Sequence, residues 1–342
     1  MKLIKRIDWA FQVVDNIIDD IFGIDSLIIK SNGGDMVSIL MATHNGEQYL
    51  KEQLDSILSQ SVQSFKIIVN DDASTDSTWE ILQEYAKTYP QKFVISRSSV
   101  NSGSAKFNFL GMMSSVHDKY VMLCDQDDVW LPDKIERTLE KMICLESKNK
   151  GKAVLVRSDM HVVNEKLEVI SNSYKSFMHS SFSRTNLNQV LIQNSFAGCS
   201  AMYNSELAKL LTRKPDYCIM HDWWLELVAS AFGVIGDLDA PTVLYRQHDN
   251  NEIGASNVRS VSYKINRLIN YKRIITAIEI TYAQAESFLK CYRNELTVKQ
   301  KKDIDLYCRI PNKSKFGKII TILKLGSFKN GLARNIAYFI FV

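Results

Sequence analysis

From Met36 to about residue 157 the chain repeats one pattern: a short apolar run, a polar turn, and a stretch whose apolar residues recur with helical spacing. The pattern predicts strands at 37–42, 65–69, 93–97, 120–124 and 153–157, with helices at 47–60, 77–88, 104–116 and 134–148. Strands separated by helices of this length predict an α/β fold, in which a mainly parallel sheet is covered on both faces. Right-handed crossovers make this half of the chain Rossmann-like.

The apolar run at 120–124 ends in three carboxylates, Asp125, Asp127 and Asp128. The run does not alternate with polar residues, which is typical of a buried parallel strand. Carboxylates at the end of such a strand are costly unless a positive group meets them. Mg²⁺ or Mn²⁺ meets this need, because proteins hold these ions with one or two carboxylates plus substrate phosphates. The alternative is a solvated acidic turn before the next helix, with Asp133 as the N-cap.

A second pair of carboxylates, Asp71 and Asp72, follows the strand at 65–69. One of them can accept a hydrogen bond from the N3–H of uracil or thymine or from a ribose hydroxyl, while the other caps the next helix. Capping by both is the alternative. The chain has no Gly-x-Gly-x-x-Gly or Gly-x-x-x-x-Gly-Lys motif, which counts against a dinucleotide oxidoreductase and a P-loop enzyme.

Asp222 stands beside two indoles, Trp223 and Trp224, at the start of an apolar helical stretch. A carboxylate in an aromatic pocket is a credible general base, and the indoles can stack on a sugar. The alternative is that Asp222 is only the N-cap of the helix.

Two other segments have the composition of a ligand site. The small residues Gly198, Cys199 and Ser200 allow a ligand to approach the backbone closely, although packing alone would explain them equally well. Arg246 and His248 follow an apolar strand at 243–245, where they can complete a metal–diphosphate site; a single loop histidine is otherwise merely exposed.

The chain divides into three parts on composition. Residues 1–35 predict an amphipathic helix and a linker; the helix can pack on the body, pair with a second copy or lie on a membrane. We expect residues 36–257 to form one domain that carries the candidate site, and residues 158–184 within it read as an irregular, exposed insertion. Residues 258–342 predict basic helices, with 17 Lys and Arg against 5 Asp and Glu, whereas the rest of the chain is acidic.

The basic C-terminal part predicts an anionic partner, which we expect to be a membrane surface and not nucleic acid. From residue 313 onwards it combines six basic residues with apolar groups, as an interfacial segment needs. Docking on the catalytic body is the alternative. No apolar run reaches 18 residues, and the six cysteines are widely spaced, so we expect reduced thiols in a cytoplasmic protein held at the inner face of the plasma membrane.

Five motifs occur together in an order that resembles family 2 glycosyltransferases of the GT-A fold. They are Val37–Asn45, Asn70–Asp76, Asn101-Ser102-Gly103, the Asp-Gln-Asp-Asp-Val-Trp string from Asp125, and His221-Asp222-Trp223-Trp224. The string from Cys124 and the Tyr-Arg-Gln-His segment from Tyr245 are most similar to the bacterial rhamnosyltransferase branch. The resemblance covers residues 36–250 and implies a GT-A fold with helical extensions at both ends.

The resemblance also implies a reaction: inverting, metal-dependent transfer of a sugar from a nucleoside diphosphate to a hydroxyl of a glycan or lipid-linked glycan. L-rhamnose from dTDP-rhamnose is the sugar that the branch implies, for a surface polysaccharide. By position in the motifs, the donor would be bound by Thr43, Asn45, Asp71 or Asp72, Asn101, Asp125 and Arg246; the metal by Asp127 and His248; the acceptor by Gly198, Cys199, Trp223 and Trp224; and Asp222 would be the base. His44 stands where many relatives have Tyr.

Three other functions remain open at this point. The donor can be a UDP-hexose. A nucleotidyltransferase also combines a Rossmann-like half with paired acids, but it would need a glycine-rich, basic loop after the first strand, which residues 43–46 lack. The chain can also be a non-catalytic scaffold of a membrane assembly, in which case the acidic clusters would be expendable.

Overall fold

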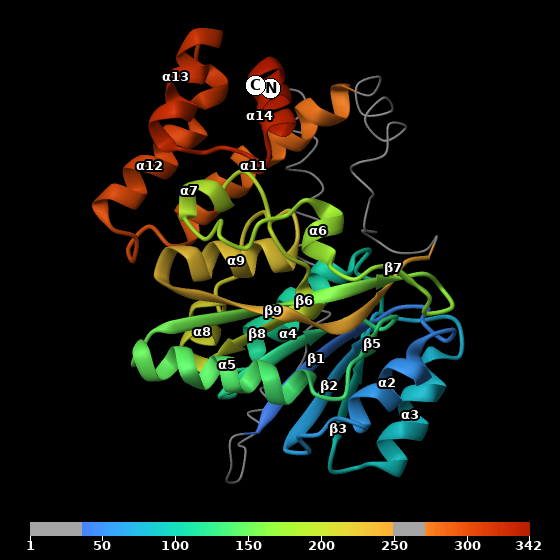
Figure 1. Ribbon diagram of the computed structural model, residues 1–342. Helices are drawn as coiled ribbons and strands as arrows, with labels where there is room; N and C mark the ends of the chain where they lie inside the picture. Colours follow the sequence, from blue (N-terminus) through green and yellow to red (C-terminus); the bar gives the residue numbers. More distant parts are fainter. Residues whose placement is uncertain (1–35, 249–270) are drawn as a thin grey trace.

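The computed structural model describes residues 36–248 and 271–342 (Figure 1). The expected amphipathic helix of residues 1–35 lies outside the described residues. Four parallel strands form the first half of the sheet: β1 (Val37–Thr43), β2 (Phe65–Asp71), β3 (Phe93–Arg97) and β4 (Tyr120–Cys124). The order in the sheet is β3-β2-β1-β4, so the strand ends that carry the acidic residues lie at one edge of the sheet.

Helices cover both faces of this sheet because residues on both faces of its strands are apolar. Alternate residues of β1 belong to two different cores: Ile39 to one and Leu40 to the other. Helices α2 (Leu50–Leu58), α3 (Thr78–Thr88) and α5 (Lys134–Lys148) pack against the first face. Helix α4 (Ala105–Ser115) and helices from later in the chain pack against the second.

The sheet continues with strands that interrupt its parallel order. β8 (Ala201–Asn204) lies antiparallel between β4 and β6 (Ala153–Val163), and β6 pairs in parallel with β9 (Gly233–Arg246). Two short strands, β5 (Val129–Trp130) and β7 (Val169–Ser171), pair with β9 and β6. The described part of the chain thus forms one mixed sheet of nine strands whose first half, β3-β2-β1-β4, is parallel.

The expectation of an irregular, exposed insertion at residues 158–184 is wrong for its first part. β6 runs on to Val163, and its residues in this stretch are almost all buried. The polar residues that obscured the strand have distant partners: Ser158 Oγ lies 2.6 Å from Thr242 Oγ1, and Ser173 Oγ donates to Asp159 Oδ2 at 2.6 Å. These partners satisfy the hydrogen-bonding groups that burial removes from water.

The connections after β6 are short elements that surround the end of the sheet. They are α6 (Tyr174–Met178), α7 (Leu187–Val190), the 3₁₀ turn η1 (Gly198–Ser200), α8 (Ser205–Leu210) and α9 (His221–Phe232). Figure 1 shows α6, α7 and α9 on the side of the sheet that faces the C-terminal helices.

The C-terminal helices pack on this same side. They are α11 (Tyr271–Cys291), α12 (Val298–Cys308), the 3₁₀ turn η2 (Ile310–Asn312), α13 (Lys315–Leu325) and α14 (Leu332–Phe341). The ring of Trp224 lies 5.5 Å from that of Phe288 in α11, and both residues belong to the core beneath α9. The boundary expected near residue 257 therefore does not separate two cores. No helix in the two described ranges is long and apolar enough to cross a bilayer.

Candidate active site

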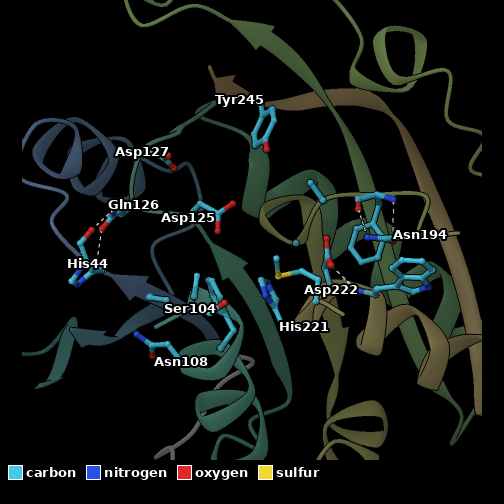
Figure 2. A pocket seen from close by; sticks show the side chains of 18 of the residues that line it. His44, Ser104, Asn108, Asp125, Gln126, Asp127, Asn194, His221, Asp222 and Tyr245 are labelled. Carbon is cyan, nitrogen blue, oxygen red and sulfur yellow. Dashed lines mark hydrogen bonds between the residues drawn. The ribbon is translucent and has the colours of Figure 1, made fainter. Parts of the chain in front are cut away.

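A cavity of about 920 Å³ opens at the carboxyl ends of β1 and β4. Figure 2 shows acidic side chains on one side of it and the start of α9 on the other. Most of the residues expected to form the site line this cavity: Thr43, Asn45, Asp72, Asn101, Asp125, Asp127, Gly198, Asp222, Trp223 and His248. Asp71, Cys199, Trp224 and Arg246, which were also expected there, do not line it.

Asp71 is fully buried beneath the cavity floor and organises the turn that follows β2. Thr43 Oγ1 donates to its Oδ1 at 3.0 Å, Ser74 N donates to its Oδ2 at 3.0 Å, and Arg97 Nε lies 3.2 Å from Oδ2. Because both carboxylate oxygens are engaged in these contacts, Asp71 is a positioning residue. The structure does not support the direct contact with the donor that was expected of it.

Asp72 lines the cavity and holds the loop after β3. Ser102 N donates to its two carboxylate oxygens at 2.9 and 3.1 Å, and Ser102 Oγ donates to Oδ2 at 2.7 Å. The idea that Asp71 or Asp72 caps the next helix is wrong, because the N-cap of α3 is Ser77. Asp72 instead ties the Asn101-Ser102-Gly103 turn to the strand end, which brings Asn101 to the cavity.

His44 is held at the rim by contacts with Asp72, Asn101 and Gln126. Its Nδ1 lies 2.9 Å from the carbonyl oxygen of Asp72, and its Nε2 lies 2.9 Å from Asn101 Nδ2. Its backbone N–H donates to Gln126 Oε1 at 2.9 Å, while Gln126 Nε2 donates back to its carbonyl at 3.0 Å. This reciprocal pair fixes the loop after β1 against the acidic loop after β4, as Figure 2 shows.

Asn45 sits in the same loop with a positive φ of 46°, a conformation that Asn tolerates better than most residues. Its backbone N–H donates to Ser74 Oγ at 3.0 Å, and its Oδ1 accepts from Thr75 N at 2.8 Å. The side chain therefore joins the loops after β1 and β2 at the cavity.

The structure brings Asp127 and His248 together across 121 residues of sequence. His248 Nε2 lies 2.8 Å from Asp127 Oδ2, and its ring lies 4.8 Å from the ring of Tyr49. Both residues line the cavity. Carboxylates with substrate phosphates suit Mg²⁺ and Mn²⁺, and a neutral imidazole is a common metal ligand. The residues present thus fit the divalent ion expected from the sequence.

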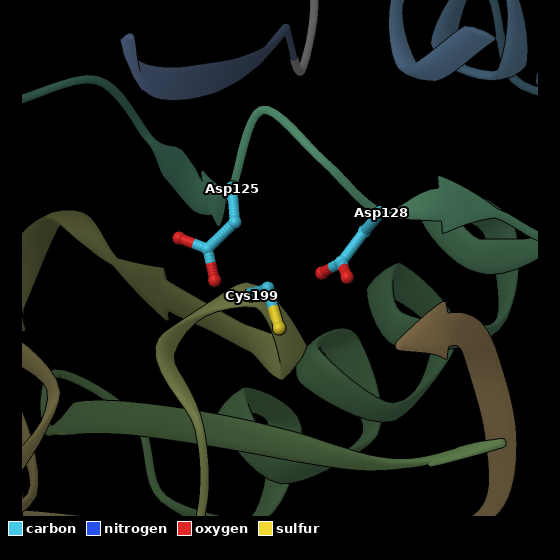
Figure 3. A group of neighbouring side chains, drawn as sticks. All are labelled: Asp125, Asp128 and Cys199. Atoms are coloured by element: carbon cyan, nitrogen blue, oxygen red, sulfur yellow. The ribbon is translucent and has the colours of Figure 1, made fainter. Parts of the chain in front are cut away.

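Asp128 is fully buried, and Figure 3 shows its side chain near those of Asp125 and Cys199. One oxygen each of Asp125 and Asp128 and the Sγ of Cys199 lie within 4.8 Å of one another. The side chain of Lys134 is also fully buried and interacts electrostatically with both Asp128 and Cys199, and burial lowers its pKa to about 8. Asp128 Oδ1 accepts from the backbone N–H of Arg246 at 3.0 Å. Burial, followed by the nearby carboxylates of Asp127 and Asp125, raises the pKa of Asp128 well above its ordinary value, and Asp128 fixes the end of β9.

Arg246 points away from the cavity, contrary to its expected contact with the diphosphate. Its Nε donates to the carbonyl oxygen of Asp127 at 2.7 Å, a second nitrogen donates to that of Glu165 at 2.6 Å, and a third pairs with Glu52. The side chain is almost fully buried. Arg246 therefore positions the backbone of Asp127, one step behind the cavity surface.

Asp222 faces the acidic cluster from the opposite wall (Figure 2). It occupies the first turn of α9, whose N-cap is Met220, so the alternative that Asp222 caps this helix is wrong. Burial raises the pKa of its carboxyl to about 7, while hydrogen bonds from Trp223 N and Asn194 act in the other direction. Trp223 N donates to Asp222 Oδ1 at 2.6 Å. A carboxylate with a pKa near neutrality is suited to proton transfer at physiological pH.

A buried ion pair fixes the loop that holds Asn194 against α9. Arg157 of β6 is fully buried, and it donates at 2.6 Å both to Glu226 Oε1, one turn after Asp222, and to Ser195 Oγ. Ser195 N donates to Glu226 Oε2 at 3.1 Å, and Arg157 also donates to Asp237 Oδ1 at 2.7 Å. Sequence patterns gave no sign of this network, because its members come from four separate segments.

His221 is a further cavity residue, to which the sequence analysis assigned no role. Its ring stacks on Phe109 with centroids 4.2 Å apart, and burial lowers its pKa to about 3. Neither ring nitrogen has a hydrogen-bond partner in the described part of the chain. A Cβ at Gly198 would lie 2.7 Å from His221 Nε2, so the absence of a side chain at position 198 makes room for a neutral imidazole.

The two indoles next to Asp222 have different surroundings. Trp223 lines the cavity, and its Nε1 donates to the carbonyl oxygen of Val190 at 2.6 Å. Trp224 is buried against Phe288 and Tyr292, with only 1% of its surface exposed, so the structure removes it from the expected acceptor contacts. Cys199 is likewise buried under the cavity wall, where only its neighbour Gly198 reaches the surface of the cavity.

Comparison with known proteins now identifies the class. The sequence profile of glycosyl transferase family 2 matches residues 38–209, and the chain belongs to this family. Over 253 residues it is 30% identical to the dTDP-rhamnosyl transferase RfbG of Shigella flexneri, an alignment that covers 70% of this chain and 83% of that protein. Over 286 residues it is 26% identical to an uncharacterized glycosyltransferase of Haemophilus influenzae, covering 79% and 84% of the two chains.

A solved structure shows the same fold. The crystal structure of S. aureus TarS 1–349 in complex with UDP-GlcNAc aligns with 85% of this chain and 80% of its own, at a TM-score of 0.52 and 17% identity. The GT-A fold implied by the sequence motifs is thereby confirmed, and the protein is a glycosyltransferase of family 2.

Proposed function

We propose that the protein transfers L-rhamnose from dTDP-rhamnose, with inversion, to a hydroxyl of a glycan or lipid-linked glycan. The observation that carries this proposal is the position of Asp222, whose carboxyl faces Asp125 and Asp127 across a single cavity. The similarity to a dTDP-rhamnosyl transferase over most of both chains supports the donor.

The residues of the cavity divide into a donor side and an acceptor side. On the donor side, the candidates to contact the nucleoside are Thr43, Asp72 and Asn101. Asp125 is the candidate to contact the rest of the sugar nucleotide. On the acceptor side, Gly198 and Trp223 flank Asp222. This division supports direct displacement, because the attacking hydroxyl would reach the sugar from the side opposite the diphosphate.

In the proposed reaction the acceptor hydroxyl oxygen forms the new bond to the anomeric carbon as the bond to the diphosphate breaks. Asp222 takes the hydroxyl proton, and Asn194 and the N–H of Trp223 hold its carboxylate in place. A base positioned in this way contributes about 10²–10⁴-fold to the rate.

Asp127 and His248 are the residues that would hold Mn²⁺ or Mg²⁺. When bound there, the ion supplies a positive charge for the diphosphate leaving group. Arg246 contributes indirectly, since it fixes the backbone of Asp127 from behind.

The test presents dTDP-rhamnose, UDP-glucose, UDP-galactose and UDP-N-acetylglucosamine in parallel, with and without Mn²⁺ or Mg²⁺, and measures donor hydrolysis and nucleotide binding. We expect metal-dependent turnover of dTDP-rhamnose that is lost in Asp127→Ala. Asp222→Asn should abolish transfer and keep donor affinity; loss of both would contradict the assignment of the base. Turnover of a UDP-hexose alone would mean that the donor is that UDP-hexose and not dTDP-rhamnose. If none of the four donors is hydrolysed and no nucleotide binds, the result would favour a non-catalytic scaffold function.

A further inference from the structure

We infer that α13 and α14 form a docking surface for anionic membranes, which presents the acceptor side of the cavity to the lipid. The acceptor part of this inference rests on the proposed function; the docking part does not. The argument starts from two apolar stripes that the described part of the protein leaves uncovered.

The first stripe runs along α13. Phe316, Ile320 and Leu323 recur at spacings of four and three residues, and 73%, 47% and 56% of their surfaces are exposed. The opposite face of the helix carries Ile322 and Leu325, which are buried in the body. α13 therefore has two apolar stripes: one packs on the body of the protein, as in other surface helices, and the other points away from it.

The second stripe runs along α14. Leu332, Ile336 and Ile340 recur every four residues and are 78%, 51% and 59% exposed. Arg334 and Tyr338 lie on the opposite face, where Tyr338 is fully buried and Arg334 lines the active-site cavity. The exposed stripe of α14 thus also points away from the body.

The two helices run antiparallel as a hairpin and are linked at both ends. A short turn with left-handed Gly326 and Gly331 joins the end of α13 to the start of α14. At the other end, Lys315 Nζ donates to the carbonyl oxygens of Ile340 and Val342 at 2.6 and 3.0 Å. Figure 1 shows the pair at the edge of the molecule farthest from α3 and β3.

The charge of this hairpin selects the partner. Residues 313–342 contain six Lys and Arg and no acidic residue, and the exposed Lys315 and Lys324 flank the stripe of α13. Apolar groups beside basic side chains are the composition that interfacial, anionic-lipid-binding helices use. A second copy of the chain fits less well, because a symmetric interface would oppose the lysines of one hairpin to those of the other.

The hairpin is attached to the acceptor rim of the cavity. Arg334 donates to the carbonyl oxygens of Met178 and His179 at 2.7 and 2.9 Å, and Asn330 N donates to Gln193 Oε1 at 2.7 Å. Asn188 Nδ2 donates to the carbonyl oxygen of Leu325 at 2.9 Å. The segment 178–193 leads directly into Asn194, the partner of Asp222. A bilayer under the hairpin would therefore lie beside the side of the cavity where the acceptor enters, which favours a lipid-linked acceptor.

The experiment is flotation of the full chain with vesicles of phosphatidylcholine, with and without 30% phosphatidylglycerol, at low and high NaCl. The stripe variant carries Gln at 316, 320, 323, 332, 336 and 340. The control carries Gln at three exposed apolar positions on other elements, Ile143, Val169 and Val298. We expect the wild type and the control to float with anionic vesicles, the stripe variant to bind at least about tenfold more weakly, and Lys324→Gln about fivefold more weakly.

Four results would overturn the inference. Equal flotation of the stripe variant and the control would remove the hairpin from membrane binding. Equal flotation with neutral and anionic vesicles would remove the role of charge. Flotation only after deletion of residues 1–35 would mean that this segment covers the stripes. A wild type that dimerises without binding vesicles, with a monomeric stripe variant, would make a second copy the partner.

Donor hydrolysis separates this inference from the proposed function. The stripe variant should hydrolyse the soluble donor at the wild-type rate, because none of its substitutions lines the cavity. A wild type that floats but hydrolyses no donor would leave the docking surface standing and refute the proposed reaction. Hydrolysis without flotation would do the reverse.

Discussion

The raised pKa of Asp222 predicts that this residue lowers the stability of the folded protein at neutral and alkaline pH. Its pKa is about 7 in the fold, against an ordinary value of 3.8. Between these two pH values the folded state binds the proton that the unfolded state has released, so stability falls as pH rises through this window. At about 1.4 kcal/mol per pKa unit, the loss reaches about 4 kcal/mol at pH 8.5 and only about 1 kcal/mol at pH 4.5.

Asp222→Asn removes this titration without changing the shape of the side chain. We expect the variant to be about 4 kcal/mol more stable than the wild type at pH 8.5 in a urea titration, which corresponds to a melting temperature about 6 °C higher. At pH 4.5 the difference should shrink to about 1 kcal/mol. The control is Glu140→Gln, an exposed carboxylate of α5, which should change stability by no more than about 0.5 kcal/mol at either pH.

Deprotonation of Asp222 should raise the activity, although it lowers the stability of the fold. The base must be deprotonated, so kcat/KM should rise with pH to a plateau, and at pH 6 it should be about tenfold below that plateau. A less stable Asp222→Asn variant at pH 8.5, or a stability difference that is the same at both pH values, would refute the reasoning. In that case the effect of burial on the pKa of Asp222 would be offset by groups other than Trp223 N and Asn194.

Three further predictions concern other residues of the site. Arg157→Leu leaves Glu226 buried without its cation and should lower the free energy of unfolding by about 3–5 kcal/mol in urea titrations, with partial recovery in Arg157→Lys. Gly198→Ala forces a methyl group against His221 and should reduce kcat/KM by about 10²-fold at unchanged secondary structure by circular dichroism. His248→Ala should raise the Mn²⁺ concentration needed for half-maximal turnover by about tenfold or more, whereas an unchanged requirement would separate His248 from the ion.

The parallel half of the sheet was predictable because its strands are buried on both faces. Such strands appear in the sequence as unbroken apolar runs. The polar residues that follow them meet at the carboxyl ends of the parallel strands. This is why Thr43, Asp72, Asp125 and Asp127 could be placed together without a structure. The extension of β6 was missed because Arg157, Ser158 and Asp159 look like the end of a strand, and their partners lie far away in the sequence.

The wall of the cavity around Asp222 was less predictable, for two physical reasons. Its residues come from loops and from α14, so no single periodic pattern joins Asn194 or Arg334 to Asp222. The tryptophans show the second reason: successive residues of a helix point about 100° apart, so only one of two neighbours can face a cavity. That rule could have separated Trp223 from Trp224, but only the packing of Phe288 decides which of the two is buried.

The position of Arg334 links two equilibria that would otherwise be independent. Its guanidinium belongs to the cavity wall, and its backbone belongs to the helix that carries one of the exposed stripes. If α14 shifts when it meets a bilayer, the wall of the cavity shifts with it. Thermodynamic reciprocity then requires that whatever factor the bilayer adds to substrate affinity, bound substrate adds to the affinity for the bilayer. Where the bilayer raises the affinity for substrate, the enzyme would stay longest on the membrane when its site is filled.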